Sequence, residues 1–245
     1  MSLELVLGIG PIIARKLANK GIKTRAQLTK AAIAGTVQLS KLTLLDLRYN
    51  IVRHIKRAVV KKYVEPYLPP NAVLVGSYAQ EKPQMGDIDV LIIRPEGATG
   101  GDCIPPPFGN DLIIYRSSQE DQHVTSGIWK IPHARGLSER GLARRKASQV
   151  GSQGTAVPCP PRGGSYVIVD VFYATEDEKP FAMLHYQGPV TFNMRVRAVA
   201  KKLGYKLNQY GLTKVRADAP DVPALKSERD VLDFLGIAWK EPRDR

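Results

Sequence analysis

The sequence predicts a mixed α/β (α+β) fold in three consecutive parts: a helical module, a strand-rich centre and a small mixed module. A turn with two glycines at residues 8–11 is followed by apolar residues at helical spacing, which indicates the helical module. Nearly continuous apolar runs at residues 88–93 and 166–173 have the pattern of buried strands. Each run contains an acidic residue, and acidic residues are rarely buried without a partner. The central strands are therefore predicted both to form the core of the fold and to hold the candidate functional residues.

The composition is that of a folded protein with a strong positive charge. The 245 residues are 43% apolar and 24% charged, and they suffice for one large domain or a few subdomains. No run approaches the roughly 20 uncharged apolar residues that cross a bilayer, and the N-terminus has no signal-peptide pattern. The net charge of +13 favours a polyanionic partner such as nucleic acid. We therefore expect an intracellular protein, in the cytoplasm or nucleus, that binds no membrane.

The two cysteines, Cys103 and Cys159, each lie in a proline-rich stretch. Two loop cysteines are more often free thiols in a reducing compartment, although the sequence leaves a disulfide between them open. They form no CxxC pair, and the four histidines have no zinc-ligand spacing. A structural zinc site is therefore not expected.

Residues 3–30 of the first module are predicted to form a helix, a tight turn and a second helix, with the glycine turn at residues 8–11. Gly21 is expected to end one helix, and Thr24 to cap the next. Residues 44–64 are expected to form one long basic amphipathic helix. The apolar positions at helical spacing after the turn are Ile12, Ile13, Leu17 and Ile22.

The centre and the C-terminal part are expected to alternate strands with helices. A strand at residues 72–75 leads into a Gly-Ser turn and a short helix, and the strands at 88–93 and 166–173 follow. Residues 95–165, rich in Gly, Pro and Ser, read as an insertion. The remaining expected elements are a strand at 112–115, a helix at 137–147, a helix near 191–203, a short hairpin and a last helix after Ser227.

Three aspartates carry the candidate chemistry. Asp87 and Asp89 are two residues apart on one expected strand, so their side chains share the face opposite Ile88. Two carboxylates this close repel each other unless a cation lies between them. Asp170 stands in the middle of the apolar run VIVDVF. If the two strands are neighbours, the three carboxylates converge on a pair of divalent metal ions, which is the two-metal design for phosphoryl transfer.

A lone Asp-x-Asp motif is more often an acidic hairpin at the surface, so the preceding residues matter. A strand that ends in Gly76 and Ser77 before a helix exposes backbone N–H groups and a hydroxyl to a phosphate. The order of this Gly-Ser pair and the later Gly86-Asp87-Ile88-Asp89 is typical of the nucleotidyltransferase superfamily. The motif predicts a nucleotidyltransferase palm.

The chain resembles the X family of DNA polymerases, and its pattern is closest to the smallest viral members. Residues 176–212 are similar to the family's thumb, and residues 227–245 to its closing segment. The resemblance implies a DNA-directed DNA polymerase that adds dNTPs to a primer 3′-OH in gap-filling repair. It also implies Mg²⁺ as the metal, with Mn²⁺ able to substitute, and gapped or primer–template DNA as the partner of a monomer. The domains implied are a hairpin module at 1–50, a palm at 51–178 and a C-terminal subdomain at 179–245.

The resemblance also assigns roles to single residues. Asp87 and Asp89 would bridge both metals, and Asp170 would bind the metal that activates the 3′-OH and assist in removing its proton. His185 and Tyr186 belong to the element that lies under the sugar and excludes a 2′-hydroxyl. Asn193 would contact the incoming base, and Arg197 the template strand. The residues implied in nucleotide binding are Gly76, Ser77, Gln80, Gly86, His185, Tyr186, Gly188, Asn193 and Arg197.

Residues 7–22, LGIGPIIARKLANKGI, resemble the helix-hairpin-helix of the same family. Such a hairpin places backbone N–H groups against a DNA phosphate without reading the sequence. The resemblance implies DNA contact by Gly8, Ile9, Gly10 and Arg197. It further implies a monovalent cation held by the backbone carbonyls of Glu4, Val6 and Ile9.

The sequence departs from the family pattern at several places. Gln80 stands where an arginine often grips the triphosphate, and Ile168 where an arginine usually lies beside the third aspartate. His185 stands where most members have an aromatic residue, so sugar selection is less certain. The family's lyase domain has no counterpart, and deoxyribose-phosphate lyase activity is not expected.

Two other functions stay open on the residues alone. A template-independent nucleotidyltransferase acting on RNA or another acceptor shares the palm motif. The hairpin and the Asn193/Arg197 pair favour duplex DNA over that alternative. A non-catalytic DNA-binding scaffold would gain nothing from three clustered acids, because unused clustered acids only destabilise a fold.

Overall fold

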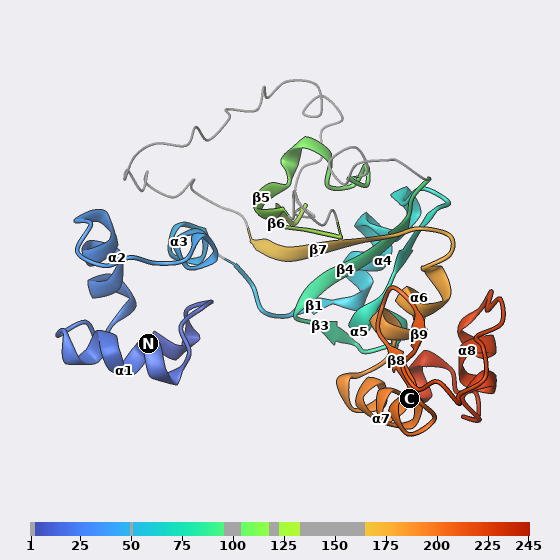
Figure 1. Cartoon of the computed structure of the whole chain (residues 1–245). Helices are drawn as coiled ribbons and strands as arrows, with labels where there is room; N and C mark the ends of the chain where they lie inside the picture. The colour runs from blue at the N-terminus through green and yellow to red at the C-terminus, as the bar shows by residue number, and fades with distance from the viewer. Residues whose placement is uncertain (1–2, 50, 96–103, 118–122, 133–164) are drawn as a thin grey trace. The chain divides into compact units, whose positions relative to one another are not determined.

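A computed structural model of the chain describes residues 3–49, 51–95, 104–117, 123–132 and 165–245 (Figure 1). The chain divides into two compact units, here called the first unit (residues 1–52 and 130–166) and the second unit (residues 53–129 and 167–245). The expected helix at 137–147 and both cysteines lie outside the described residues. Within the described part, none of the helices is both long and apolar enough to cross a membrane.

In its described residues, the first unit has three α-helices around a small apolar core. Its core consists of Leu3, Val6, Ile9, Leu17 and Leu28. Thr24 caps the second helix through a capping box with Gln27, as the sequence predicted. The elements are η1 (Leu3–Leu5), α1 (Pro11–Asn19), α2 (Arg25–Ile33) and α3 (Lys41–Arg48).

Two of the apolar positions expected at helical spacing do not face this core. Ile12 and Ile13 are 72% and 43% exposed, whereas Leu17 is buried. Leu3, Val6 and Ile9, which precede α1, occupy the core instead. The predicted helix is present, but the segment before the turn, rather than the first turn of α1, supplies most of the apolar contacts of this core.

The prediction of one long helix at residues 44–64 was wrong. Helix α3 ends at Arg48, and Ile51 forms a parallel bridge with Tyr166 in the first unit. In the second unit, β1 (Ile55–Lys56) pairs with β3 (Gln84–Met85), and α4 (Arg57–Tyr63) starts only after it. β-Branched side chains lose rotamer freedom in helices and fit strands well. At Ile51 and Ile55, pairing with another strand is therefore favoured over continuation of the helix.

A five-stranded sheet of order β2-β4-β7-β6-β5 forms the base of the candidate site. The expected strands at 72–75, 88–93, 112–115 and 166–173 are present, whereas β6 was not expected. Strands β4 and β7 are parallel, whereas β2 and β4 are antiparallel, as are β5 and β6. The bounds are β2 (Ala72–Leu74), β4 (Asp87–Ile93), β5 (Ile113–Ser117), β6 (Val124–Lys130) and β7 (Tyr166–Ala174).

Helix α6 (Lys179–Gln187) joins the sheet to the C-terminal residues of the second unit. Its Ala182 packs with Val75 and Leu91 of the sheet. Its Phe181 and Leu184 belong to a separate core with α7 (Val190–Lys202) and α8 (Glu228–Phe234). The other elements are η2 (Glu65–Tyr67), α5 (Gly76–Ala79), η4 (Gly109–Asp111), β8 (Tyr205–Leu207), β9 (Leu212–Lys214) and η5 (Pro242–Asp244).

Candidate active site

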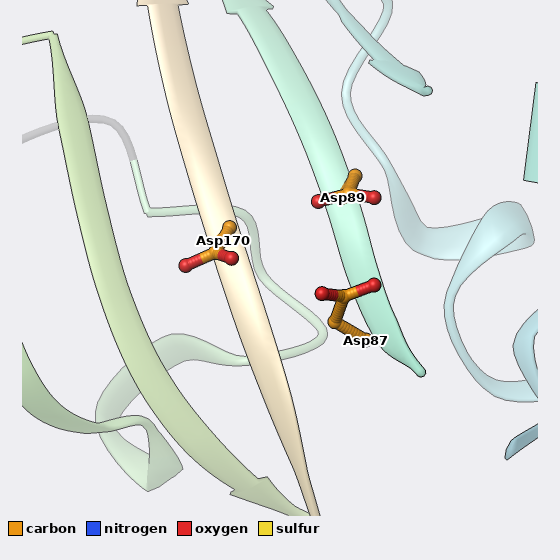
Figure 2. Close-up of side chains that lie close together, drawn as sticks. All are labelled: Asp87, Asp89 and Asp170. Carbon is orange, nitrogen blue, oxygen red and sulfur yellow. The ribbon is translucent and has the colours of Figure 1, made fainter. Parts of the chain in front are cut away.

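Three aspartates meet on one face of the central strands (Figure 2). In the parallel register of β4 and β7, Asp89 lies directly opposite Asp170, and Asp87 lies opposite Ile168. Ile88 and Val90 point to the other face of β4, where they are buried. One oxygen from each of the three carboxylates lies within 4.8 Å of the other two.

Burial and mutual repulsion disfavour the ionised form of these acids. Burial raises the pKa of Asp87 and Asp170 above the ordinary value. The pKa of Asp89 rises to about 7 through burial first, and then through the charges of Asp87 and Asp170. Hard divalent cations prefer such carboxylate oxygens and would relieve the repulsion. The donor set therefore fits a metal centre.

Gly76 is pressed against Asp89. Its φ is +57°, and a β-carbon at this position would lie 2.0 Å from Asp89 Oδ2. The amide of Val75 donates to the backbone oxygen of Asp89 at 2.9 Å. Only glycine combines that backbone conformation with such a close approach. The Gly76-Ser77 turn is thereby fixed next to the acids.

The other two palm residues expected at the nucleotide have different surroundings. Gln80 Nε2 donates to the backbone oxygen of Gln187 at 3.2 Å, so this side chain links α5 to the end of α6. Gly86 is exposed, and the only described atom within 4 Å of a β-carbon there would be the Arg53 oxygen, at 3.8 Å. A side chain would therefore fit at residue 86 but not at residue 76.

Tyr186 lies on the acidic face of the sheet. Its ring stacks on Phe172 at a centroid distance of 4.1 Å, and Phe172 follows Asp170 by two residues on the same face of β7. Burial raises the pKa of Tyr186, so its hydroxyl stays protonated at neutral pH. Packing on Phe172 thus holds the ring on the face of the sheet that carries Asp170.

His185 faces α7 instead. Arg197 Nη2 lies 3.2 Å from His185 Nδ1, and an arginine can only donate, so Nδ1 accepts and the proton of the neutral ring is on Nε2. Burial, and then the charge of Arg197, lower the pKa of His185. Asn193 Nδ2 donates to the backbone oxygen of His185 at 2.7 Å. A β-carbon on Gly188 would lie 2.9 Å from Asn193 Oδ1, so the glycine makes room for this amide.

A small depression lies beside His185 and Arg197. His185, Asn193, Arg197 and Asn208 form its polar side, and Phe181 and Leu184 belong to its apolar side. The expected nucleotide-binding residues are thus grouped in two places in the second unit. In the first group, Gly76 contacts Asp89 and Tyr186 stacks on Phe172, and the second group lines the depression.

The hairpin of the first unit has its own supporting network, which the sequence did not reveal. Gly8 has a φ of +79°, and a β-carbon there would lie 2.6 Å from Thr43 Oγ1. Thr43 Oγ1 donates to the Leu7 oxygen, and Asp46 accepts from both the Leu7 amide and Arg25 Nη1. No described atom comes within 4 Å of a β-carbon placed on Gly10. Gly8 is therefore required by the fold, and Gly10 is not.

The side chain of Ile9 is buried, so this residue can offer only its backbone to a partner. Its amide donates to the Val6 oxygen at 3.1 Å. That oxygen retains a second lone pair, as any carbonyl does. Of the carbonyls expected to hold a monovalent cation, those of Val6 and Ile9 belong to the turn closed by the hydrogen bond between them, and that of Glu4 belongs to the preceding η1.

The structure adds three residues to the site that sequence reasoning missed: Tyr115, Arg116 and Ser126. Ser126 hydrogen-bonds to Asp170, and the positive charge of Arg116 acts on the same carboxylate. Tyr115 hydrogen-bonds to Ser126. No pattern could have pointed to them, because the strand VTSGIWK lacks an apolar alternation and its place beside β7 depends on strand order.

Comparison with known proteins decides the family. The Repair DNA polymerase X of African swine fever virus (strain Badajoz 1971 Vero-adapted) is 30% identical over 199 residues, which cover 80% of this chain and 95% of the viral protein. This chain belongs to the X family of DNA polymerases. Residues 182–245 of this X-family polymerase also match the family model described as DNA polymerase beta thumb.

Cellular relatives extend the same similarity. DNA polymerase lambda of Rattus norvegicus is 24% identical over 189 residues, covering 71% of this chain and 28% of the rat protein. DNA polymerase lambda of Arabidopsis thaliana is 24% identical over 261 residues, covering 98% of this chain and 45% of the plant protein. The expected family and the expected palm and thumb fold are confirmed.

Proposed function

We propose that this X-family DNA polymerase fills gaps during DNA repair by adding deoxynucleotides to a primer 3′-OH. The observation that carries the proposal is the convergence of Asp87, Asp89 and Asp170 within 4.8 Å beside the Gly76-Ser77 turn. The similarity to a viral protein named Repair DNA polymerase X supports the repair role. Gapped or primer–template DNA and dNTPs are the proposed substrates.

Asp87 and Asp89 are proposed to ligate two Mg²⁺ ions, for which Mn²⁺ can substitute, and Asp170 to ligate one of them. When bound, such ions would lower the pKa of the attacking hydroxyl and neutralise negative charge on the triphosphate. The preference for Mg²⁺ follows from the hard oxygen donors of three carboxylates. The pKa of Asp89, about 7, means that binding a cation at neutral pH also displaces a fraction of a proton.

In the proposed reaction the primer 3′-oxygen forms a bond to the α-phosphorus of the dNTP, and the bond from that phosphorus to pyrophosphate breaks. The 3′-OH proton passes to a base, and the Asp170 carboxylate is the proposed acceptor. Gly76, Ser77, Gln80 and Gly86 are proposed to hold the triphosphate, through backbone N–H groups and the Ser77 hydroxyl. Gln80 acts there through its link to Gln187.

The sugar and base contacts are proposed for the residues around α6 and α7. Tyr186 would crowd a 2′-hydroxyl, because its ring is fixed on Phe172 next to Asp170. His185, Gly188 and Asn193 would contact the nucleotide, and Arg197 the template strand. The bond between Arg197 and His185 keeps these two side chains together.

The first unit is proposed to bind DNA phosphate through the backbone of Gly8, Ile9 and Gly10. A monovalent cation on the carbonyls of Glu4, Val6 and Ile9 would supply positive charge at that contact. The net charge of +13 supports binding of a polyanion. We further infer that the protein acts as a monomer, inside the cell, where its DNA lies in the cytoplasm or nucleus.

Primer extension on DNA with a one-nucleotide gap tests the proposal. Each dNTP is supplied alone opposite each of the four template bases, with Mg²⁺ or with a chelator. Template-directed addition that needs the metal is expected. Addition that ignores the template base would instead establish the template-independent nucleotidyltransferase, an alternative that the family comparisons do not support.

A further inference from the structure

A bulge in β5 brings two side chains to the same position of the sheet. Strands β5 and β6 pair Ile114 with Gly127 and Arg116 with Ser126, so Tyr115 is an extra residue with no partner of its own in the register. In such a bulge two residues oppose one, and the local bend re-aims a side chain. Tyr115 and Arg116 therefore both lie against Ser126.

The next pairing places Ser126 beside the acids. The amide of Tyr173 donates to the His123 oxygen, and the amide of Ile131 donates to the Ser165 oxygen. Both bonds belong to one antiparallel register of β6 and β7, and this register sets Ser126 opposite Asp170. That position falls between the bonded pairs, where facing side chains are closest. Asp89, Asp170, Ser126 and Arg116 thus form one row across four adjacent strands.

The hydrogen bonds along this row have a definite direction. Ser126 is 3% exposed and has one hydroxyl proton, and an ionised carboxylate can only accept. Ser126 therefore donates to Asp170. Burial, and then the charge of Asp170, raise the pKa of Tyr115 to about 12, so the phenol keeps its proton and can donate to Ser126. Tyr115 thus donates to Ser126, and Ser126 donates to Asp170.

We propose that Ser126 and Tyr115 are positioning residues that hold Asp170 as a metal ligand, which rests on the metal-binding role proposed above. Ser126 occupies one lone-pair direction of the carboxylate and fixes its rotation, so the remaining oxygen sites face the cation. Tyr115 fixes the Ser126 hydroxyl in turn. Hydrogen bonds to ligating carboxylates commonly contribute 10–100-fold to metal affinity.

Arg116 has a different part in this row. Its side chain is exposed, and its charge favours the ionised form of Asp170. Solvent screens an exposed charge, so the charge is expected to contribute little to the geometry of the carboxylate. Ser126 and Tyr115, which act by direct hydrogen bonds, are therefore the residues to vary.

The test measures Mn²⁺ binding to the full-length protein, with free Mn²⁺ counted by electron paramagnetic resonance. Ser126→Ala should weaken the apparent Kd about tenfold or more, and Tyr115→Phe by a smaller factor in the same direction. Ser126→Thr restores the hydroxyl and should recover most of the affinity. Thr125→Val is the matched control, since Thr125 is equally buried on the same strand and points to the opposite face.

A purely structural role would lower the melting temperature of Ser126→Ala without changing its Mn²⁺ affinity. Unchanged affinity in folded Ser126→Ala overturns the inference. If Ser126→Ala does not fold, Tyr115→Phe decides in the same way, because it removes only a hydroxyl from a half-buried ring.

Asp170→Ala separates this inference from the proposed function. If Asp170→Ala leaves both Mn²⁺ binding and nucleotide addition intact, the proposed role of Asp170 fails. If Asp170→Ala loses Mn²⁺ binding and nucleotide addition while Ser126→Ala keeps both, only the positioning role of Ser126 fails.

Discussion

Gly76 and Asp89 lie in such close contact that a single methyl group at residue 76 would overlap the carboxylate. The virtual β-carbon of Gly76 lies 2.0 Å from Asp89 Oδ2, and the residue has a φ of +57°. The Gly-Ser motif thus has a steric role in addition to any contact with phosphate. Asp89 and the turn at Gly76 must therefore be considered as one unit.

The first prediction follows from this contact. Gly76→Ala should displace the Asp89 carboxylate and lower kcat/KM for one-nucleotide gap filling by about 100-fold, since displacing a reacting group by about 1 Å has effects of that size. Gly211→Ala is the matched control, because no described atom lies within 4 Å of a β-carbon there and its backbone is outside the left-handed region. Equal activities of the two variants would show that the contact does not matter.

The second prediction concerns the third aspartate. Asp170→Asn keeps the shape of the side chain and removes its charge, so nucleotide addition should fall by about three orders of magnitude or more. Binding of gapped DNA should survive, because the strand remains packed. Asp218→Asn, an exposed carboxylate in a surface ion pair with Arg216, serves as the control. Extension by Asp170→Asn at a few per cent of the wild-type rate would contradict the assignment.

The third prediction separates fold from DNA contact in the hairpin. Gly10→Leu has space for its side chain and should weaken binding to all DNA sequences about equally, by roughly tenfold, with a flatter salt dependence. Its melting temperature should not change. Gly8→Ala should instead lower the free energy of unfolding by about 1 kcal/mol or more, because of its φ of +79° and the nearby Thr43 Oγ1. Unchanged DNA affinity in folded Gly10→Leu would mean that the hairpin only packs.

The acidic site shows which features can be read from a sequence. Asp87 and Asp89 were predicted to share a face because strand periodicity is local, and Asp170 stood out among apolar neighbours. Ser126 and Tyr115 gave no such signal, because their place beside Asp170 depends on strand order and on a bulge. Non-local pairing is not encoded in any short window of residues.

The same reason explains the helix wrongly expected at residues 44–64. The segment has apolar and basic residues that fit a helical face, yet Ile55 pairs with Met85, which lies in a different part of the sequence. The cap of α2 was predicted correctly, because a cap involves neighbours only. Thr24 caps α2 through its own side chain, as expected, and Ser227, after which the last helix was expected, caps α8.

The fourth prediction concerns the choice of sugar. Tyr186→Ala removes the ring that lies on Phe172, so the ratio of kcat/KM for dGTP over GTP should fall by about tenfold or more. Tyr186→Phe keeps the ring and should keep most of the ratio. His185→Ala should raise KM for both nucleotides more than it changes this ratio. An unchanged dGTP/GTP ratio in Tyr186→Ala would exclude this element as the sugar gate.

The last prediction is a pH dependence that depends on His185. Because burial and Arg197 lower its pKa from 6.5, the ring is neutral at pH 7 and Nδ1 accepts from Arg197. Protonation would place a second donor and a second positive charge against Arg197. A histidine with a lowered pKa in the folded state contributes stability that is present above its unfolded pKa. That stability decreases as the pH falls from about 6.5 through the lower folded value.

Nucleotide binding should follow the same titration. The KM for dGTP should rise as the pH falls from about 6.5 through the lowered pKa of His185, at a metal concentration high enough to keep the aspartates ionised. Asp89, with a pKa of about 7, would otherwise titrate over the same interval and also lose activity in acid. His185→Gln keeps a hydrogen-bond acceptor for Arg197 and cannot titrate, so its KM should stay nearly constant over this range while the loss due to the aspartates remains. If the wild-type protein and His185→Gln show the same dependence of KM on pH, the pair of His185 and Arg197 has no part in binding the nucleotide.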